Sequence, residues 1–296
     1  MNRFTALLLI LLFYIQQANA QVTEFENWKL ARVSELRSED GWINLAGLLW
    51  LDEENIFLNQ ISDDSLVLSD RAGKKNIGSF QLWNDTVWFN FNSKLVKNSK
   101  RLLPTKALQY PTENYALGAL YYDHWKWTVI QRGGLYAIRL RDLTHPELKN
   151  FTGIPVFEYN PNFIVMAFFE PRFNETMEIP NVLGQLIEWK VMGILRFELE
   201  GKKYELTALD EAGKLFVIFS DETSGKETYP TGRYLYVNYP DRTGITEVDF
   251  NFSYNPPCAF TPFATCPIPP KVNRLPFALE AGEKAPVGHR KKNGSF

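Results

Sequence analysis

The chain has 296 residues with 32 basic and 34 acidic side chains, and its formal net charge is −2 at pH 7. A general nucleic-acid binder would normally be basic, so no nucleic-acid partner is expected. Aromatic residues make up 15% of the chain, which allows a substantial core and favours strands over helices. The length suits one large domain or two small ones.

The first twenty residues have the pattern of a secretory signal peptide. Arg3 precedes an apolar run that extends to Ile15, and the segment ends in Ala-Asn-Ala, the small-x-small pattern of a cleavage site. The apolar run is shorter than the about 20 residues that span a bilayer; the alternative is an uncleaved N-terminal anchor. We therefore predict a signal peptide, a mature chain without a membrane span, and an exported protein.

The residues after the leader predict one helix followed by strands. Thr23–Ser38 places apolar side chains on one broad face, and Thr23 with Glu26 fits a capping box. The next segment, GWINLAGLLWLDEEN, fits a buried helix or a buried strand equally well. From Ile56 onward, short β-forming segments alternate with turns. The clearest hairpin is KWTVIQRGGLYAIRLRD, in which Gly133-Gly134 forms the turn.

The second half of the chain predicts consecutive strands joined by short turns. They are NFIVMAFFE, LIEWKVMGILRFELE, YELTALD, LFVIFS, RYLYVN and TEVDF. The predicted fold class is mainly β: an antiparallel β-barrel or strongly curved sheet with an N-terminal helix and few other helices. We divide the chain into a signal peptide (1–20), an N-terminal helix and buried apolar segment (21–60), a first β-rich region (61–155), a β-barrel region with a proline–cysteine loop (156–283) and a polar tail (284–296).

The proline–cysteine loop, YNPPCAFTPFATCPIPP (Tyr254–Pro270), contains six of the 17 prolines and both cysteines. Its prolines exclude a helix and a central strand. In an oxidising compartment two cysteines form a disulfide more often than a metal site, so we predict a disulfide between Cys258 and Cys266. Two buried free thiols and a redox-active pair are the alternatives, although the C-x7-C spacing differs from the C-x-x-C of thioredoxin-like proteins.

The sequence contains no familiar catalytic motif. We find no G-x-S-x-G, H-E-x-x-H, Walker A or G-x-G-x-x-G pattern, and only three histidines are present. No cofactor and no transition-metal site are therefore expected, while a carboxylate-rich site for a hard cation stays open. His124 beside Asp123 could form a base and its orienting group, but adjacent residues of a strand point to opposite faces.

Polar residues in the loops of the second half are the candidates for a pocket that binds a small polar or anionic ligand. These residues are Asp221, Thr223, Thr228, Tyr229, Arg233, Asp249, Asn255 and Arg274. Such side chains suit a binding loop on a rigid sheet, and they equally suit ordinary turns. Arginines that converge would match a carboxylate or phosphate group, and Arg139 and Arg141 share one strand face. The alternative is a set of Arg–Asp pairs within the barrel, for example Arg233 with Asp249.

The residues DETSGKETYPTGRYLYV, VDFNFSYNPPCAFTPFATCPIPPKVNRLPFALEAGEK, RLRD and FTGIPVFEYNP resemble the DUF1684 family of bacterial proteins of unknown function. The resemblance is dense from about residue 134 to 283 and weaker at WKLARVSELRSEDGWINLAGLLWL. It implies an ordered proline–cysteine loop and a bacterial source, hence a periplasmic or secreted location, and it assigns no catalytic residue. The other residues that it implies belong to the family pattern are Asp221, Thr223, Gly225, Thr228, Tyr229, Arg233, Asp249, Asn255, Arg274 and Glu283.

Two classes of function fit these residues. The favoured one is a non-catalytic binding or interaction module, because histidine, serine-elbow and metal motifs are missing; no protein partner is indicated. The other is a hydrolase-like exported enzyme in which Arg233 binds an anion and Asp221 or Asp249 acts as a general base, which requires a raised pKa. Convergence of the side chains on one concavity would support a pocket, whereas mutual burial in Arg–Asp pairs would support a structural role.

Overall fold

The computed structural model describes residues 3–52, 55–92, 94, 96–98, 101–102, 105–112 and 118–286, without the side chains of residues 3–19, 97–98 and 101–102. The chain forms two compact units, one of residues 1–36, 152–260 and 265–296 and the other of residues 37–151 and 261–264. Strands predominate in both units, and the described helices are α1 (Arg3–Arg37), α2 (Glu147–Asn150) and short 3-10 turns. The predicted fold class is confirmed.

The unit of residues 37–151 consists of two antiparallel sheets, with strand orders β1-β11-β10-β9-β6-β7 and β3-β2-β4-β5-β8. One hydrophobic core includes residues of both sheets, and the rings of Phe89 and Trp127 lie 5.4 Å apart within it. The strands are β1 (Leu45–Trp50), β2 (Asn55–Ser62), β3 (Ser65–Ser69), β4 (Asn76–Trp83), β5 (Thr86–Phe91), β6 (Lys97–Asn98), β7 (Arg101–Leu102), β8 (Lys106–Tyr110), β9 (Leu120–Tyr122), β10 (Trp125–Arg132) and β11 (Leu135–Asp142).

Two sequence expectations are decided in this unit. The apolar segment of ambiguous period is a strand, β1, because its backbone pairs with β11. The predicted hairpin is confirmed: β10 and β11 pair from Arg132↔Leu135 outward, and Gly133 and Gly134 have φ angles of 56° and 78°. Glycine adopts positive φ without a steric penalty, which is what this tight turn requires.

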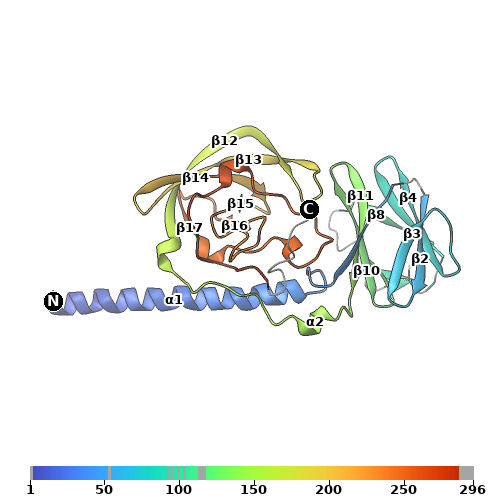
Figure 1. Cartoon of the computed structure of the whole chain (residues 1–296), viewed down its shortest axis with the longest axis horizontal. Coiled ribbons are helices and arrows are strands. Elements are labelled where there is room, and N and C mark those ends of the chain that lie inside the picture. The colour runs from blue at the N-terminus through green and yellow to red at the C-terminus, as the bar shows by residue number, and fades with distance from the viewer. Residues whose placement is uncertain are drawn as a thin grey trace. The chain divides into compact units, whose positions relative to one another are not determined.

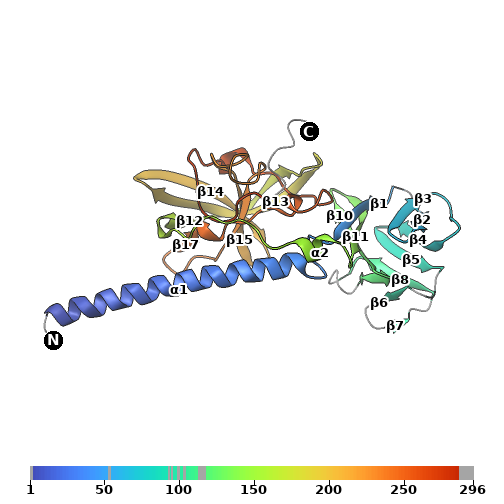
Figure 2. The same cartoon turned by 60° about the horizontal axis from the view of Figure 1, so that its bottom comes forward.

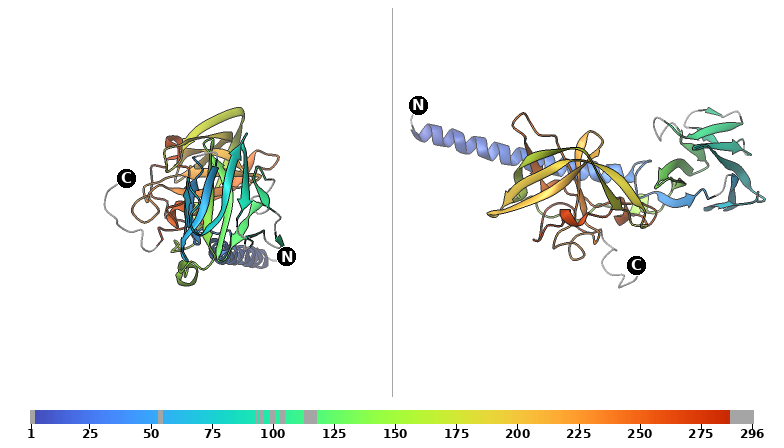
Figure 3. Two further views of the ribbon diagram at one scale, coloured as in Figure 1. Left: turned by 90° about the vertical axis from the view of Figure 1, so that its right-hand side faces the viewer. Right: turned by 90° about the horizontal axis from the view of Figure 1, so that it is seen from above.

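The other unit is built on a curled half-barrel sheet, in which β17 pairs with β12 and the strand order is β16-β15-β14-β13-β12-β17 (Figure 1). The long strands β12 and β13 curve over the rest of the sheet (Figure 3, yellow). Pro171 is tolerated in β12 because it adjoins a bulge, where the register against β13 shifts. The strands are β12 (Ile164–Pro180), β13 (Leu186–Leu199), β14 (Lys202–Glu211), β15 (Lys214–Phe219), β16 (Arg233–Val237) and β17 (Ile245–Asp249).

Helix α1 lies alongside the half-barrel (Figure 2). Phe25 and Leu36 are buried, and the ring of Phe25 contacts those of Tyr159 and Phe252. The expectation that a capping box at Thr23 begins the helix is wrong, because the chain is already helical from Arg3. In the part of the chain whose side chains are described, no helix is both long and apolar enough to cross a membrane. The side chains of the predicted leader and the tail beyond residue 286 lie outside the described residues.

Candidate functional site

A buried ion pair joins Arg233, the first residue of β16, to Asp221, which follows β15. Both side chains are fully buried, and Nη2 of Arg233 lies 2.9 Å from Oδ2 of Asp221. The guanidinium also donates to the carbonyl oxygens of Leu279 and Ala281. Buried charges are tolerated when they are paired and hydrogen-bonded in this way. The Arg–Asp pair that the sequence offered as an alternative therefore exists, with Asp221 rather than Asp249 as the partner.

Two further predicted residues complete this buried network. Oγ1 of Thr223 donates to Oδ1 of Asp221 at 2.6 Å and lies 2.8 Å from Oγ1 of Thr228. The backbone N–H groups of Thr223 and Leu279 donate to the same carboxylate oxygen. Asp221 therefore receives hydrogen bonds from the loop that follows it and from the C-terminal segment, and the four residues hold these segments together.

A second buried ion pair was not predicted from the sequence. Arg32 of α1 contacts Glu283 at 3.0 Å, and their side chains are only 7% and 1% exposed. Arg32 also donates to the carbonyl oxygen of Asn255, whose backbone N–H donates to Glu283. The predicted residue Asn255 thus belongs to this network. Arg32 lies four residues after Trp28 and four before Leu36, on the apolar face of the helix. A charged residue on that face was the sequence signal that could have predicted a buried ion pair.

Tyr229 contacts the proline–cysteine loop. Its hydroxyl donates to the carbonyl oxygen of Cys258 at 2.9 Å. The backbone N–H of Cys258 donates to Sγ of Cys266 at 3.0 Å, and both cysteines are free thiols in this structure. The 3-10 turn Pro257–Ala259 lies within the loop, and a second 3-10 turn, Lys271–Asn273, directly follows it. The loop is therefore ordered, as the resemblance implied.

Asp249 lines a cavity of about 590 Å³ that we call the helix groove. Its walls are α1, the ends of β16 and β17, and the residues that follow β17. The lining includes four aromatic side chains and three carboxylates. The lining residues are Glu24, Asn27, Trp28, Ala31, Lys214, Tyr236, Val237, Asn238, Thr246, Glu247, Asp249, Phe252 and Tyr254.

Two carboxylates of the helix groove, Asp249 and Glu247, have raised pKa values. Burial raises the pKa of Asp249 above its ordinary value, and the nearby charge of Glu24 adds to the effect, although Asn251 donates two hydrogen bonds to the carboxylate. Burial and the charge of Asp249 also raise the pKa of Glu247. The lining contains three carboxylates and one lysine, so the helix groove favours neutral hydrogen-bond donors and cations over anions.

Replacing Asp249 with asparagine is expected to change the pH dependence of stability. Compared with the wild type, the variant should lose less stability as the pH rises from acidic to neutral. Because the folded pKa of Asp249 is raised, the wild type loses stability as the pH rises from the ordinary Asp value through the folded value; asparagine removes this loss. Melting temperatures from pH 3 to pH 8 measure it. Asp241→Asn is the control with the opposite sign, since hydrogen bonds from Thr243 lower the pKa of Asp241. A pH-independent effect at Asp249 would contradict the prediction.

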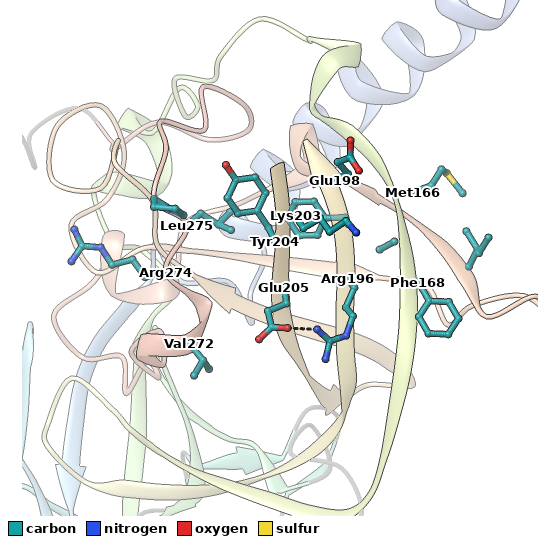
Figure 4. Close-up of a pocket in the computed structure, with 14 residues that line it drawn as sticks. Met166, Phe168, Arg196, Glu198, Lys203, Tyr204, Glu205, Val272, Arg274 and Leu275 are labelled. Carbon is teal, nitrogen blue, oxygen red and sulfur yellow. Dashed lines mark hydrogen bonds and ion pairs between the residues drawn. The ribbon is translucent and has the colours of Figure 1, made fainter. Parts of the chain in front are cut away.

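Arg274 lines a separate cavity of about 690 Å³ on the sheet face (Figure 4). Arg196 contacts Glu170 at 2.9 Å and Glu205 at 2.5 Å, while Arg274 points away from this cluster (Figure 4) and pairs with Glu222 at 3.3 Å. The charges of this shallow surface therefore compensate one another, and no anion-binding cluster of arginines forms there. Neither cavity is lined by Asp221, Thr223, Thr228, Tyr229, Arg233 or Asn255.

Arg139 and Arg141 lie in the other unit, where both guanidinium groups lie over the ring of Trp42. Arg141 also donates to Oδ1 of Asn44 at 2.8 Å. They hold the segment before β1 against β11.

Nδ1 of His124 lies 3.1 Å from Oδ2 of Asp123, so the expectation that the two side chains point apart was wrong. Both residues lie in the turn between β9 and β10, where Asp123 has a φ of 55°. Among the described residues, no group of three or more His, Cys, Asp or Glu side chains could hold a metal ion.

The fold and its two buried ion pairs define a β-rich half-barrel protein in which most of the predicted polar residues are part of the packed structure. Residues 149–284 match a family described as "Protein of unknown function (DUF1684)", and the chain belongs to this family. No curated protein matches the chain. A solution NMR structure of an uncharacterized protein from Haloarcula marismortui is similar, with 31% sequence identity over 49% of this chain and 83% of that chain and a TM-score of 0.40.

Proposed function

We propose that the protein is an exported binding module and that the helix groove binds a small polar ligand, neutral or cationic. The observation that carries this proposal is the combination of aromatic rings and carboxylates in one cavity of about 590 Å³. Small-molecule sites typically have volumes of about 300–1,000 Å³. Rings provide flat apolar surface and attract cations, while carboxylates accept hydrogen bonds from hydroxyl and ammonium groups.

The walls of the helix groove are held in place by contacts within the protein, so the proposed site is preformed. The rings of Trp28 and Phe252 meet edge to face with centroids 5.4 Å apart, and those of Tyr236 and Tyr254 stack at 5.9 Å. Arg32, one turn beyond Trp28, anchors α1 through Glu283. A rigid wall lowers the entropic cost of ligand binding.

Export to the periplasm or the medium is part of the proposal, and it is supported by the leader pattern of residues 1–20. In an oxidising compartment we expect Cys258 and Cys266 to form a disulfide. This is supported by the hydrogen bond from the backbone of Cys258 to Sγ of Cys266. Mass spectrometry of the denatured protein from the periplasm would measure both the loss of the leader and the loss of two hydrogens.

Trp28→Ala is expected to weaken ligand binding at least about tenfold, because it removes one aromatic wall of the helix groove. Native mass spectrometry of the periplasmic protein would first identify any retained molecule. Thermal-shift titration with neutral sugars, amines and amino acids would then measure binding to each variant. Leu30→Ala is the matched control, since Leu30 lies on the same helix and is 71% exposed. Equal affinities of the two variants, or no binding by the wild type, would refute the proposed site.

The second candidate function is hydrolase-like catalysis in the same groove, with Asp249 as the general base. It is favoured by the raised pKa of this carboxyl in a ligand-sized cavity. Arg233 has no part in it, because its side chain is fully buried against Asp221. Loss of ligand turnover with retained binding in Asp249→Asn would establish this function; binding without turnover in the wild type would leave the binding module.

A further inference from the structure

Cys258 and Cys266 have no part in the proposed ligand site, yet they differ from each other in ways that matter for thiol chemistry. The two thiols form a hydrogen bond with each other. Cys258 is partly exposed, whereas Cys266 is 3% exposed. Cys258 is therefore the more exposed residue of the pair, and Cys266 lies beside it but is shielded from solvent.

Two tyrosine hydroxyls lie beside this thiol pair. That of Tyr229 donates to the carbonyl oxygen of Cys258, and that of Tyr234 donates to the carbonyl oxygen of Pro267, the residue after Cys266. The hydrogen bond from Cys266 holds the pKa of the Cys258 thiol below its ordinary value, while burial raises the pKa of Cys266. Donors around one sulfur stabilise its thiolate, the form that attacks disulfides.

The loop brings the thiols together without a covalent bond between them. Pro256, Pro257, Pro267 and Pro269 flank the two cysteines, and proline restricts the unfolded chain more than the folded loop. The backbone N–H of Cys258 already lies 3.0 Å from Sγ of Cys266 in the free-thiol state. The folded loop therefore holds the two cysteines in contact before any disulfide forms.

We propose that Cys258 and Cys266 form an exchange-active dithiol, with Cys258 as the nucleophile, Cys266 as the resolving thiol and small disulfides of the glutathione class as substrates. The proposal rests on the disulfide proposed above, which is its oxidised state. The Cys258 thiolate attacks one sulfur of the small disulfide, forms a mixed disulfide and releases one thiolate. Cys266 passes its proton to the released thiolate and attacks Sγ of Cys258, which breaks the mixed disulfide and releases the second thiolate, protonated by solvent. The two cysteines are oxidised by two electrons, and the small disulfide is reduced to two thiols.

The first test uses the reduced wild-type protein. Iodoacetamide at neutral pH is expected to alkylate Cys258 at least about tenfold faster than Cys266, as measured by peptide mass mapping. This measurement needs no variant, so a folding defect cannot obscure it. Equal rates, or faster alkylation of Cys266, would overturn the assignment of the nucleophile.

The second test uses oxidised glutathione. We expect the wild type to close its disulfide, Cys266→Ala to retain one glutathione on Cys258, and Cys258→Ala to gain none. Buffers of reduced and oxidised glutathione then measure reversibility. A disulfide that forms but is never reduced in these buffers would overturn exchange activity and leave the proposed disulfide intact. No disulfide in either the periplasmic or the glutathione-treated protein would overturn both.

Discussion

Arg233→Ala is expected to lower the free energy of unfolding by about 3–5 kcal/mol, the usual cost of breaking a buried ion pair. The substitution leaves the carboxylate of Asp221 buried without its cation. It also removes the donor to the carbonyl oxygens of Leu279 and Ala281. Urea unfolding measures the change, and the slope of the transition shows whether the unfolded state changes as well.

The matched control for Arg233 is Arg274→Ala in the same unit. The side chain of Arg274 is 68% exposed, and its pair with Glu222 is open to solvent. Such pairs contribute about 0–1 kcal/mol, so the control should unfold close to wild type. Should Arg233→Ala keep full stability and lose ligand binding instead, Arg233 would be a binding residue, and the structural role assigned to the pair would be wrong.

Glu283→Ala is expected to cost about 3–5 kcal/mol for the same reason, and it should also loosen α1. The substitution leaves Arg32 buried without its main carboxylate partner and deprives the backbone N–H of Asn255 of an acceptor. If α1 no longer packs against the half-barrel, proteolysis within the C-terminal part of α1 should be faster. Urea unfolding and limited proteolysis together measure the two effects.

Glu26→Ala tests whether removing any carboxylate in this region has the same result. Glu26 pairs with Lys29 on the exposed side of α1, and its side chain is 56% exposed, so a change below about 1 kcal/mol is expected. Glu283→Gln separates charge from shape, because glutamine fills the same space without the negative charge. Wild-type stability in both Glu283 variants would show that the pair with Arg32 does not anchor the helix.

The two buried networks change how the polar residues of this family are interpreted. Asp221, Thr223, Thr228 and Arg233 bond to one another, and Asn255 bonds to the backbone and to Glu283. Buried polar groups need partners, so a cluster of polar residues in the sequence is also what a buried structural network requires. The helix groove lies elsewhere and includes only Asp249 of the predicted residues.

Local patterns in the sequence were sufficient to predict these strands and one hairpin turn. Segments rich in β-forming residues and separated by short turns predicted β13, β14, β15 and β16. Gly133-Gly134 predicted the hairpin of β10 and β11, because few other residues adopt positive φ at both positions. These features depend only on neighbours in the chain.

The partners of the buried charges were decided by the tertiary structure alone. Arg233 pairs with Asp221 rather than Asp249, and Arg32 pairs with a carboxylate 251 residues away. The helix groove likewise combines α1 with the ends of β16 and β17. Contacts between residues so far apart depend on how the sheet curls and where the helix packs, and no short stretch of sequence encodes that geometry.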